Sequence, residues 1–150
     1  MKTTKKKVLG LLLSAIAATM LLFAVGCTSS GGAKEVAVTE GTIVADGGSI
    51  TASLEGNATT GFMWIADIEG DTVVQVTDNY VPIEAEKGAP EIVGAGGTHE
   101  LGFTASGTGD SVITFKYTRS FEEKAGADDI IYKVKASVKD GVVDKLELQK

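Results

Sequence analysis

The stretch that most constrains the fold reads IIYKVKASVKDGVVDKLEL and spans residues 130–148. Every second residue from Ile130 to Val138 is apolar, and lysine or serine fills most of the positions between them. This period of two is the pattern of a half-buried β-strand, because successive side chains of a strand point to opposite faces. The Asp140-Gly141 pair then suits a type I′ turn, in which both central residues need a positive φ. Residues 130–148 therefore predict a β-hairpin.

The same alternation runs through most of the chain upstream of this hairpin. It is clearest at Ile50–Glu55, Leu101–Ala105 and Ile113–Thr118, and weaker at Val36–Ala45, Met63–Ile68, Thr72–Val81 and Val142–Leu148. Glycine separates many of these runs, and no segment has a sustained helical stripe of apolar residues. The pattern predicts a single all-β domain, an antiparallel sandwich or barrel of seven or eight strands. We expect five aromatic side chains in its core: Trp64, Phe103, Phe115, Tyr117 and Tyr132.

The first 26 residues have the composition of an export signal. Four lysines precede an uncharged stretch from Val8 to Val25, which is also nearly long enough for a transmembrane helix. Cys27 favours the signal, because LFAVGC at residues 22–27 resembles a bacterial lipobox, whose cysteine becomes a lipidated N-terminus. We therefore expect a lipoprotein signal peptide at 1–26, a lipidated Cys27 with a flexible tether at 27–33, and a folded domain at 34–150. The domain would be anchored to a membrane and face outside the cytoplasm, at the cell surface or in the periplasm.

Charge and rare residues exclude several classes of function. The chain has 14 Lys and Arg against 20 Asp and Glu, and the 124 residues after the predicted signal carry a formal net charge of −10. A chain this acidic lacks the basic face that nucleic-acid binding needs. One Cys and one His remove most catalytic and metal-binding arrangements. We therefore expect a monomeric binding protein without enzymatic activity, cofactor or metal.

Two polar features have plain structural interpretations. His99, the sole histidine, falls in a predicted strand and is expected to face solvent. Asp67, Glu69 and Asp71 alternate along the chain and could hold Ca²⁺, but the rest of an EF-hand pattern is missing, so a solvated turn is favoured. Neither feature points to catalysis.

Three turns depart from ordinary turn chemistry. The first, NATTGFMW at residues 57–64, has a polar tip that Asn57 and the threonines can stiffen by bonding their own backbone. The second, GAGGT at residues 94–98, has three glycines in four residues, which let a backbone approach another molecule closely. The third, YTRSFE at residues 117–122, ends a strand in an arginine and an aromatic residue, types that are enriched at interfaces. Each has a plain alternative: a tight hairpin loop, a mobile surface loop and a stray core phenylalanine, respectively.

Taken in this order, the three turns resemble the motifs of the chagasin family of cysteine-peptidase inhibitors. The family's first motif reads Asn-Pro-Thr-Thr-Gly-aromatic-x-Trp, and residues 57–64 match it except that Ala58 replaces the proline. The second motif, Gly-x-Gly-Gly, is met at residues 94–97. The third, Arg-Pro-Trp before an acidic residue, occurs at residues 119–122 with two substitutions. The resemblance covers roughly residues 36–138.

The resemblance implies an immunoglobulin-like antiparallel β-sandwich that reversibly inhibits papain-like cysteine peptidases. Three loops, at residues 58–62, 94–97 and 119–121, would plug the active-site cleft, and no acyl transfer would occur. Peptidase contacts carried over from the family's motifs fall on Asn57, Thr59, Thr60, Gly61, Phe62, Gly94, Gly96, Gly97, Arg119 and Phe121.

Three departures from the family's motifs predict a weaker or differently selective inhibitor. Ala58 replaces a proline that would restrict the unbound first loop, and Ser120 replaces another in the third loop. Phe121 stands where the family has tryptophan, and so offers less contact area and no N–H donor. These departures keep an alternative open: an immunoglobulin-like surface lipoprotein that binds another protein or a ligand without inhibiting a peptidase.

Overall fold

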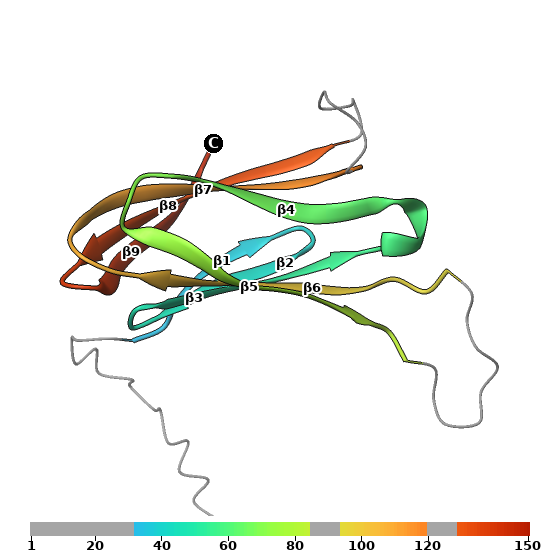
Figure 1. Cartoon of the computed structure of the whole chain (residues 1–150), viewed down its shortest axis with the longest axis horizontal. Coiled ribbons are helices and arrows are strands. Elements are labelled where there is room, and N and C mark those ends of the chain that lie inside the picture. Colours follow the sequence, from blue (N-terminus) through green and yellow to red (C-terminus); the bar gives the residue numbers. More distant parts are fainter. Residues whose placement is uncertain (1–31, 85–93, 120–128) are drawn as a thin grey trace, which may run out of the picture.

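Nine β-strands and one short 3-10 helix make up the regular structure of the residues that the computed structural model describes, 32–84, 94–119 and 129–150 (Figure 1). The strands are β1 (Lys34–Val38), β2 (Gly41–Asp46), β3 (Ser49–Gly56), β4 (Phe62–Glu69), β5 (Val73–Pro82), β6 (Gly97–Ala105), β7 (Gly109–Arg119), β8 (Ile130–Lys139) and β9 (Val142–Gln149), and the helix η1 (Ala58–Thr60) lies between β3 and β4. Within this part of the chain, no helix is long and apolar enough to span a membrane. The predicted signal peptide, Cys27 and most of the predicted tether lie outside the described residues, as does Phe121.

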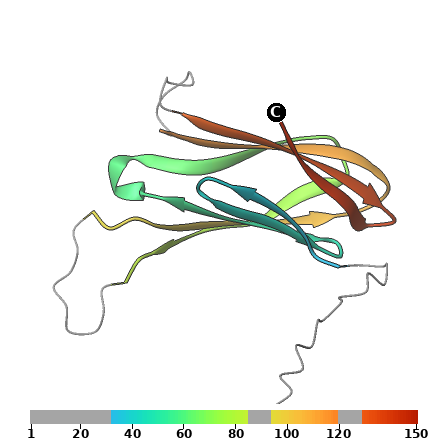
Figure 2. The same cartoon turned by 180° about the vertical axis from the view of Figure 1, so that it is seen from behind.

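The strands form two sheets, stacked as the layers of a sandwich (Figures 1 and 2). One sheet has the order β1-β2-β3-β6-β5 and the other has the order β4-β7-β8-β9, and every strand pair is antiparallel. The predicted immunoglobulin-like antiparallel sandwich is confirmed. The expected number of seven or eight strands is wrong, because the segment predicted as one strand at 36–45 folds back on itself. Its two halves pair as β1 and β2, with Val38 opposite Gly41.

The core lies between the inward faces of the two sheets, as the alternation predicts. Phe103 of one sheet meets Phe115 of the other edge to face, with ring centroids 5.7 Å apart, and both side chains are fully buried. Trp64 is also fully buried, whereas Tyr117 and Tyr132 are only partly buried against the core. Burying such aromatic side chains supplies much of the hydrophobic stabilisation of a domain of this size.

The predicted hairpin at 130–148 is present as β8 and β9. Asp140 has a φ of 52° and Gly141 has a φ of 76°, as a type I′ turn requires. The Asp140 N–H also donates a hydrogen bond of 2.9 Å to the Thr108 hydroxyl, which fastens this turn to the neighbouring β6–β7 connection. Local turn chemistry and strand alternation therefore agree along this whole segment.

The expectation that His99 faces solvent is wrong. Its side chain is on the inward face of β6, in the same alternating set as Leu101 and Phe103, and the residue is only 4% exposed. A polar ring can occupy an inward position because both ring nitrogens have hydrogen-bond partners there. Among the acidic residues considered for Ca²⁺, Asp67 accepts a hydrogen bond from the Lys116 ammonium. The described residues contain no cluster of three or more potential metal ligands.

Three of the loop connections leave the sandwich at the same end. Gly56 at the end of β3 pairs with Gly97 at the start of β6, and Pro82 at the end of β5 pairs with the same glycine. In the other sheet, Phe62 at the start of β4 pairs with Arg119 at the end of β7. Figure 1 shows these strand ends together at the right, and the start of β1 at the opposite end of the sandwich.

Candidate functional site

The turn between β3 and β4 is a small projection built from its own hydrogen bonds. Asn57 caps η1: its side-chain oxygen accepts hydrogen bonds from the Thr59 N–H at 3.1 Å and from the Thr59 hydroxyl at 2.6 Å. The Thr60 hydroxyl donates to the Asn57 carbonyl at 2.6 Å. Gly61 ends the turn with a φ of 83°, which L side chains rarely adopt. Residues 58–61 are exposed, so the tip is both stiff and accessible.

A column of four aromatic rings supports this projection from below. Phe62 stacks on Tyr117 at 5.2 Å between centroids, Tyr117 lies 5.1 Å from Trp64, and Trp64 stacks on Tyr132 at 5.8 Å. One hydrogen bond connects the column to the turn and another connects it to β3: the Asn57 N–H donates to the Tyr117 hydroxyl at 2.7 Å, and the Trp64 indole N–H donates to the Glu55 carbonyl at 2.9 Å. The exposed turn is therefore rooted in the buried core.

Tyr132, at the far end of this column, donates a hydrogen bond from its hydroxyl to the carboxylate of Glu40 in the β1–β2 turn. Burial is the main reason that the pKa of the Tyr132 phenol is raised above its ordinary value of 10.0, and the Glu40 carboxylate raises this pKa further. The neutral phenol is thus the form that the folded protein favours.

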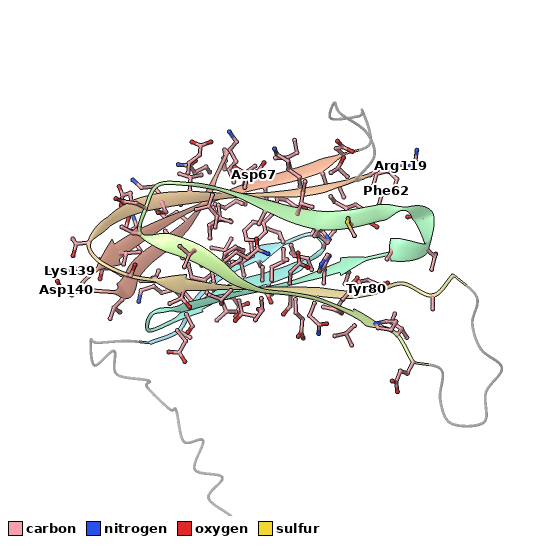
Figure 3. All side chains as sticks on the ribbon, in the orientation of Figure 1. Phe62, Asp67, Tyr80, Arg119, Lys139 and Asp140 are labelled. Atoms are coloured by element: carbon pink, nitrogen blue, oxygen red, sulfur yellow. The ribbon has the colours of Figure 1, made fainter. Side chains whose placement is uncertain are left out.

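The third motif meets the first through Arg119. Its guanidinium carbon lies 4.6 Å from the centroid of the Phe62 ring, in cation–π geometry, and the two residues face each other in the β4–β7 ladder (Figure 3). The predicted partner residue Phe121 lies outside the described residues. Of the third motif, the structure thus places the arginine beside the first loop.

The glycine-rich second motif meets the first through a direct hydrogen bond. The Asn57 side-chain amide donates to the Gly94 carbonyl at 2.9 Å, and Gly94 itself is exposed with a φ of 84°. A side chain at Gly96 would place its Cβ 2.9 Å from the Gly56 carbonyl oxygen. At Gly97, which is buried, a Cβ would lie 2.6 Å from the ring of Tyr80. Gly96 and Gly97 therefore serve close packing inside the chain, and only Gly94 is freely presented.

An open pocket of about 390 Å³ lies between the first and second motifs. It is lined by Glu55, Gly56, Asn57, Ile83, Gly96, Gly97, Thr98 and Tyr117. The described parts of the three motifs offer hydroxyl groups, glycine backbone, aromatic rings and one guanidinium. Such groups suit recognition of another molecule's surface.

Sequence reasoning missed the contacts that join these motifs. Neither the Asn57–Gly94 hydrogen bond nor the role of the Tyr117 hydroxyl was predicted, although a tyrosine in a core strand needs a partner for its O–H. The packing of Tyr80 against Gly97 also went unpredicted. The residues themselves could be seen in the sequence, but nothing in it identified their partners, because the partners are far apart along the chain.

Comparison with known proteins identifies the family. Residues 44–136 match the model of the chagasin family peptidase inhibitors, I42. Amoebiasin-1 of Entamoeba histolytica is 33% identical over 92 residues, which cover 61% of this chain and 84% of that protein. Among solved structures, Amebosin is 32% identical with a TM-score of 0.48, covering 62% of this chain and 82% of that one. The cysteine protease inhibitor EhICP2 from Entamoeba histolytica is 23% identical with a TM-score of 0.45, covering 57% and 75%.

The match runs from β2 into β8 and includes the described residues of the three motifs, 57–64, 94–97 and 119, so it takes in both joined loops and the aromatic column. Members of this family are inhibitors of peptidases and not enzymes themselves. The chain belongs to the chagasin family of peptidase inhibitors.

Proposed function

We propose that this protein reversibly inhibits papain-like cysteine peptidases by inserting three loops into the active-site cleft. Family membership supports peptidase inhibition as the activity. The observation that carries the proposal for these loops is their joining at one end: Asn57 bonds to Gly94, and Arg119 stacks on Phe62. Two loops and the start of the third thus form one continuous surface.

The first loop would enter the centre of the cleft, near the peptidase's catalytic cysteine. Thr60 and Gly61 lie at its exposed tip, and the tip is held by hydrogen bonds within the turn. A loop that is already ordered loses little conformational entropy on docking, and this preserves affinity. Inhibition would be reversible, because the closed 3-10 turn does not present an extended peptide for cleavage.

The second and third loops would contact the two walls of the cleft. The Gly94–Gly97 loop, in which Gly94 is exposed, would lie against one wall in an extended, strand-like contact. Arg119 and Phe121 would rest on the other wall, with the guanidinium oriented by the Phe62 ring. The three contacts together would exclude substrate from the cleft.

We also propose that Cys27 carries a lipid anchor and that the domain faces outward from the membrane. The lipobox-like LFAVGC at residues 22–27 supports the lipid. The position of the start of β1, at the opposite end of the sandwich from the three loops, supports the orientation (Figure 1). A tether entering at that end would leave the loops pointing away from the membrane.

The test is a titration of papain with the fragment of residues 34–150, with a fluorogenic peptide as substrate. Inhibition that is reversible and competitive with substrate supports the proposal, and Phe121→Ala should weaken it if the third loop takes part. A folded fragment that inhibits neither papain nor several related peptidases would overturn it. The remaining interpretation would then be the non-inhibitory binding module.

A further inference from the structure

His99 joins the two sheets at a point below the first and second loops. Its Nδ1 accepts a hydrogen bond of 3.2 Å from the backbone N–H of Trp64, and its Nε2 lies 2.6 Å from an Asp78 carboxylate oxygen. Trp64 belongs to β4, the edge strand of one sheet, whereas His99 and Asp78 belong to β6 and β5 of the other. The imidazole therefore connects the edge of β4 with the facing sheet.

The position of this connection matters because both strands lead directly into the loops. Trp64 is two residues beyond Phe62, and His99 is two residues beyond Gly97. The Asn57–Gly94 hydrogen bond joins the same two loops farther out, at an exposed level. Two hydrogen bonds at different depths thus hold the loops: one joins the loops themselves and the other joins the strands beneath them.

The hydrogen-bond partners of His99 select one form of the ring. A backbone N–H can only donate, so Nδ1 must be unprotonated to accept from Trp64. The hydrogen of the neutral ring is then on Nε2, where it is donated to Asp78. A second hydrogen on Nδ1 would point at the Trp64 N–H, and the connection between the sheets would be lost.

We propose that His99 is a positioning residue for inhibition: as a neutral imidazole with its hydrogen on Nε2, it holds the first loop at the correct separation from the second. The proposal rests on the proposed function, since it assigns these loops to peptidase binding. His99 is 4% exposed and acts on the loops through Trp64.

The ring of His99 has neighbours on three other strands. From β5, the ring faces the Asp78 carboxylate and the edge of the Tyr80 ring, at 6.0 Å between centroids. From β4 it meets the Trp64 backbone, and its cross-strand neighbour in β3 is Leu54. The next residue, Glu100, is exposed on the outer face. Asp78 can pair with the protonated ring, but that pairing does not restore an acceptor for the Trp64 N–H.

The test compares three variants of the full-length chain, purified in detergent, with the wild type. His99→Gln places an amide oxygen and nitrogen at about the spacing of the ring nitrogens, so it can keep both bonds and cannot be protonated. His99→Leu removes both bonds at similar volume. Leu101→Ala, a buried truncation on the same inward face of β6, controls for loss of stability alone. The inhibition constant for papain and the thermal midpoint are measured for each protein.

At neutral pH we expect His99→Gln to inhibit within about threefold of wild type, and His99→Leu to inhibit about tenfold more weakly, as the loss of one buried hydrogen bond implies. His99→Gln also tests the proposal if His99→Leu does not fold, because it can keep both hydrogen bonds of the ring.

Two results would overturn the proposal: a His99→Gln variant that inhibits no better than His99→Leu, or a His99→Leu variant that inhibits as tightly as Leu101→Ala. A wild type that inhibits no peptidase would instead overturn the proposed function. The Trp64 amide proton gives a readout that needs no peptidase. Its hydrogen exchange should be slow in wild type and His99→Gln and fast in His99→Leu, and equal exchange in all three would overturn the His99–Trp64 connection itself.

Discussion

The side-chain amide of Asn57 donates a hydrogen bond of 2.9 Å to the backbone carbonyl of Gly94, 37 residues farther along the chain. The same side chain uses its oxygen to cap η1 through Thr59. One asparagine thus shapes the first loop with one atom and attaches it to the second loop with another. A loop pair joined in this way can behave as a single rigid surface.

Replacing Asn57 by alanine should affect both stability and inhibition. Loss of the cap lowers the free energy of unfolding by about 0.5–2 kcal/mol, measured by urea denaturation. Release of the second loop weakens papain inhibition by about tenfold, because two loops must then be ordered on binding. Asn79→Ala, at an exposed position of β5, is the matched control and should change neither quantity. Unchanged inhibition by Asn57→Ala would show that the loops act independently.

Removing the hydroxyl of Tyr117 should destabilise the protein without disturbing the ring column. Tyr117→Phe keeps the contacts with Phe62 and Trp64 but leaves the Asn57 N–H without its acceptor, at a cost of about 1–3 kcal/mol in unfolding free energy. Tyr80→Phe is the control, because the Tyr80 hydroxyl makes only a long hydrogen bond of 3.5 Å to Gly56. Equal losses in the two variants would contradict this assignment.

Introducing the proline of the family's motif at position 58 should stabilise the first loop. Asn57 has an extended conformation, with φ −131° and ψ 92°, and Ala58 begins the turn, a position that proline favours. Ala58→Pro should therefore raise the unfolding free energy by about 0.4–1 kcal/mol and tighten inhibition. Thr59→Pro is the opposite control, because it removes the N–H that donates to the Asn57 side chain. Destabilisation by both prolines would count against the loop geometry.

A bulky charge at the tip of the first loop should abolish inhibition while leaving the fold intact. Thr60 is exposed, so Thr60→Arg should shift the thermal midpoint little, and its inhibition of papain should weaken by more than about 100-fold. Thr60→Ser keeps the hydroxyl that donates to the Asn57 carbonyl and serves as the conservative control. Retained inhibition by Thr60→Arg would exclude the first loop from the centre of the cleft.

The raised pKa of Tyr132 predicts a loss of stability in alkali. The folded protein favours the neutral phenol through burial and through Glu40, so this contribution is fully present below the ordinary tyrosine pKa of 10.0 and is lost as the pH rises above it. Unfolding free energy measured by urea denaturation from about pH 8 to about pH 11 should fall more steeply in wild type than in Tyr132→Phe. Equal slopes of unfolding free energy against pH in the two proteins would show that other groups cause the loss of stability in alkali.

Strand positions and turn chemistry could be predicted from the sequence because they depend on neighbouring residues. The alternation at Ile130–Val138 and the Asp140-Gly141 turn specified the β8–β9 hairpin, and the structure confirms it. Asn57 and Gly61 likewise indicated a stiff turn from their own backbone chemistry, and the structure has one. In both places the hydrogen bonds and the required φ values lie within a few residues.

Which distant residues meet depends on how the strands pack, and local sequence patterns do not show it. A period of two shows which side chains share a face of a strand, but a polar residue such as His99 can face inward when other strands supply its partners. The bond from Asn57 to Gly94 and the stacking of Arg119 on Phe62 depend on how β3, β4, β6 and β7 are placed. The strands, the turns and the motifs follow from local sequence patterns. Their assembly into one surface depended on burial of a core shared by both sheets, to which residues from the whole chain contribute.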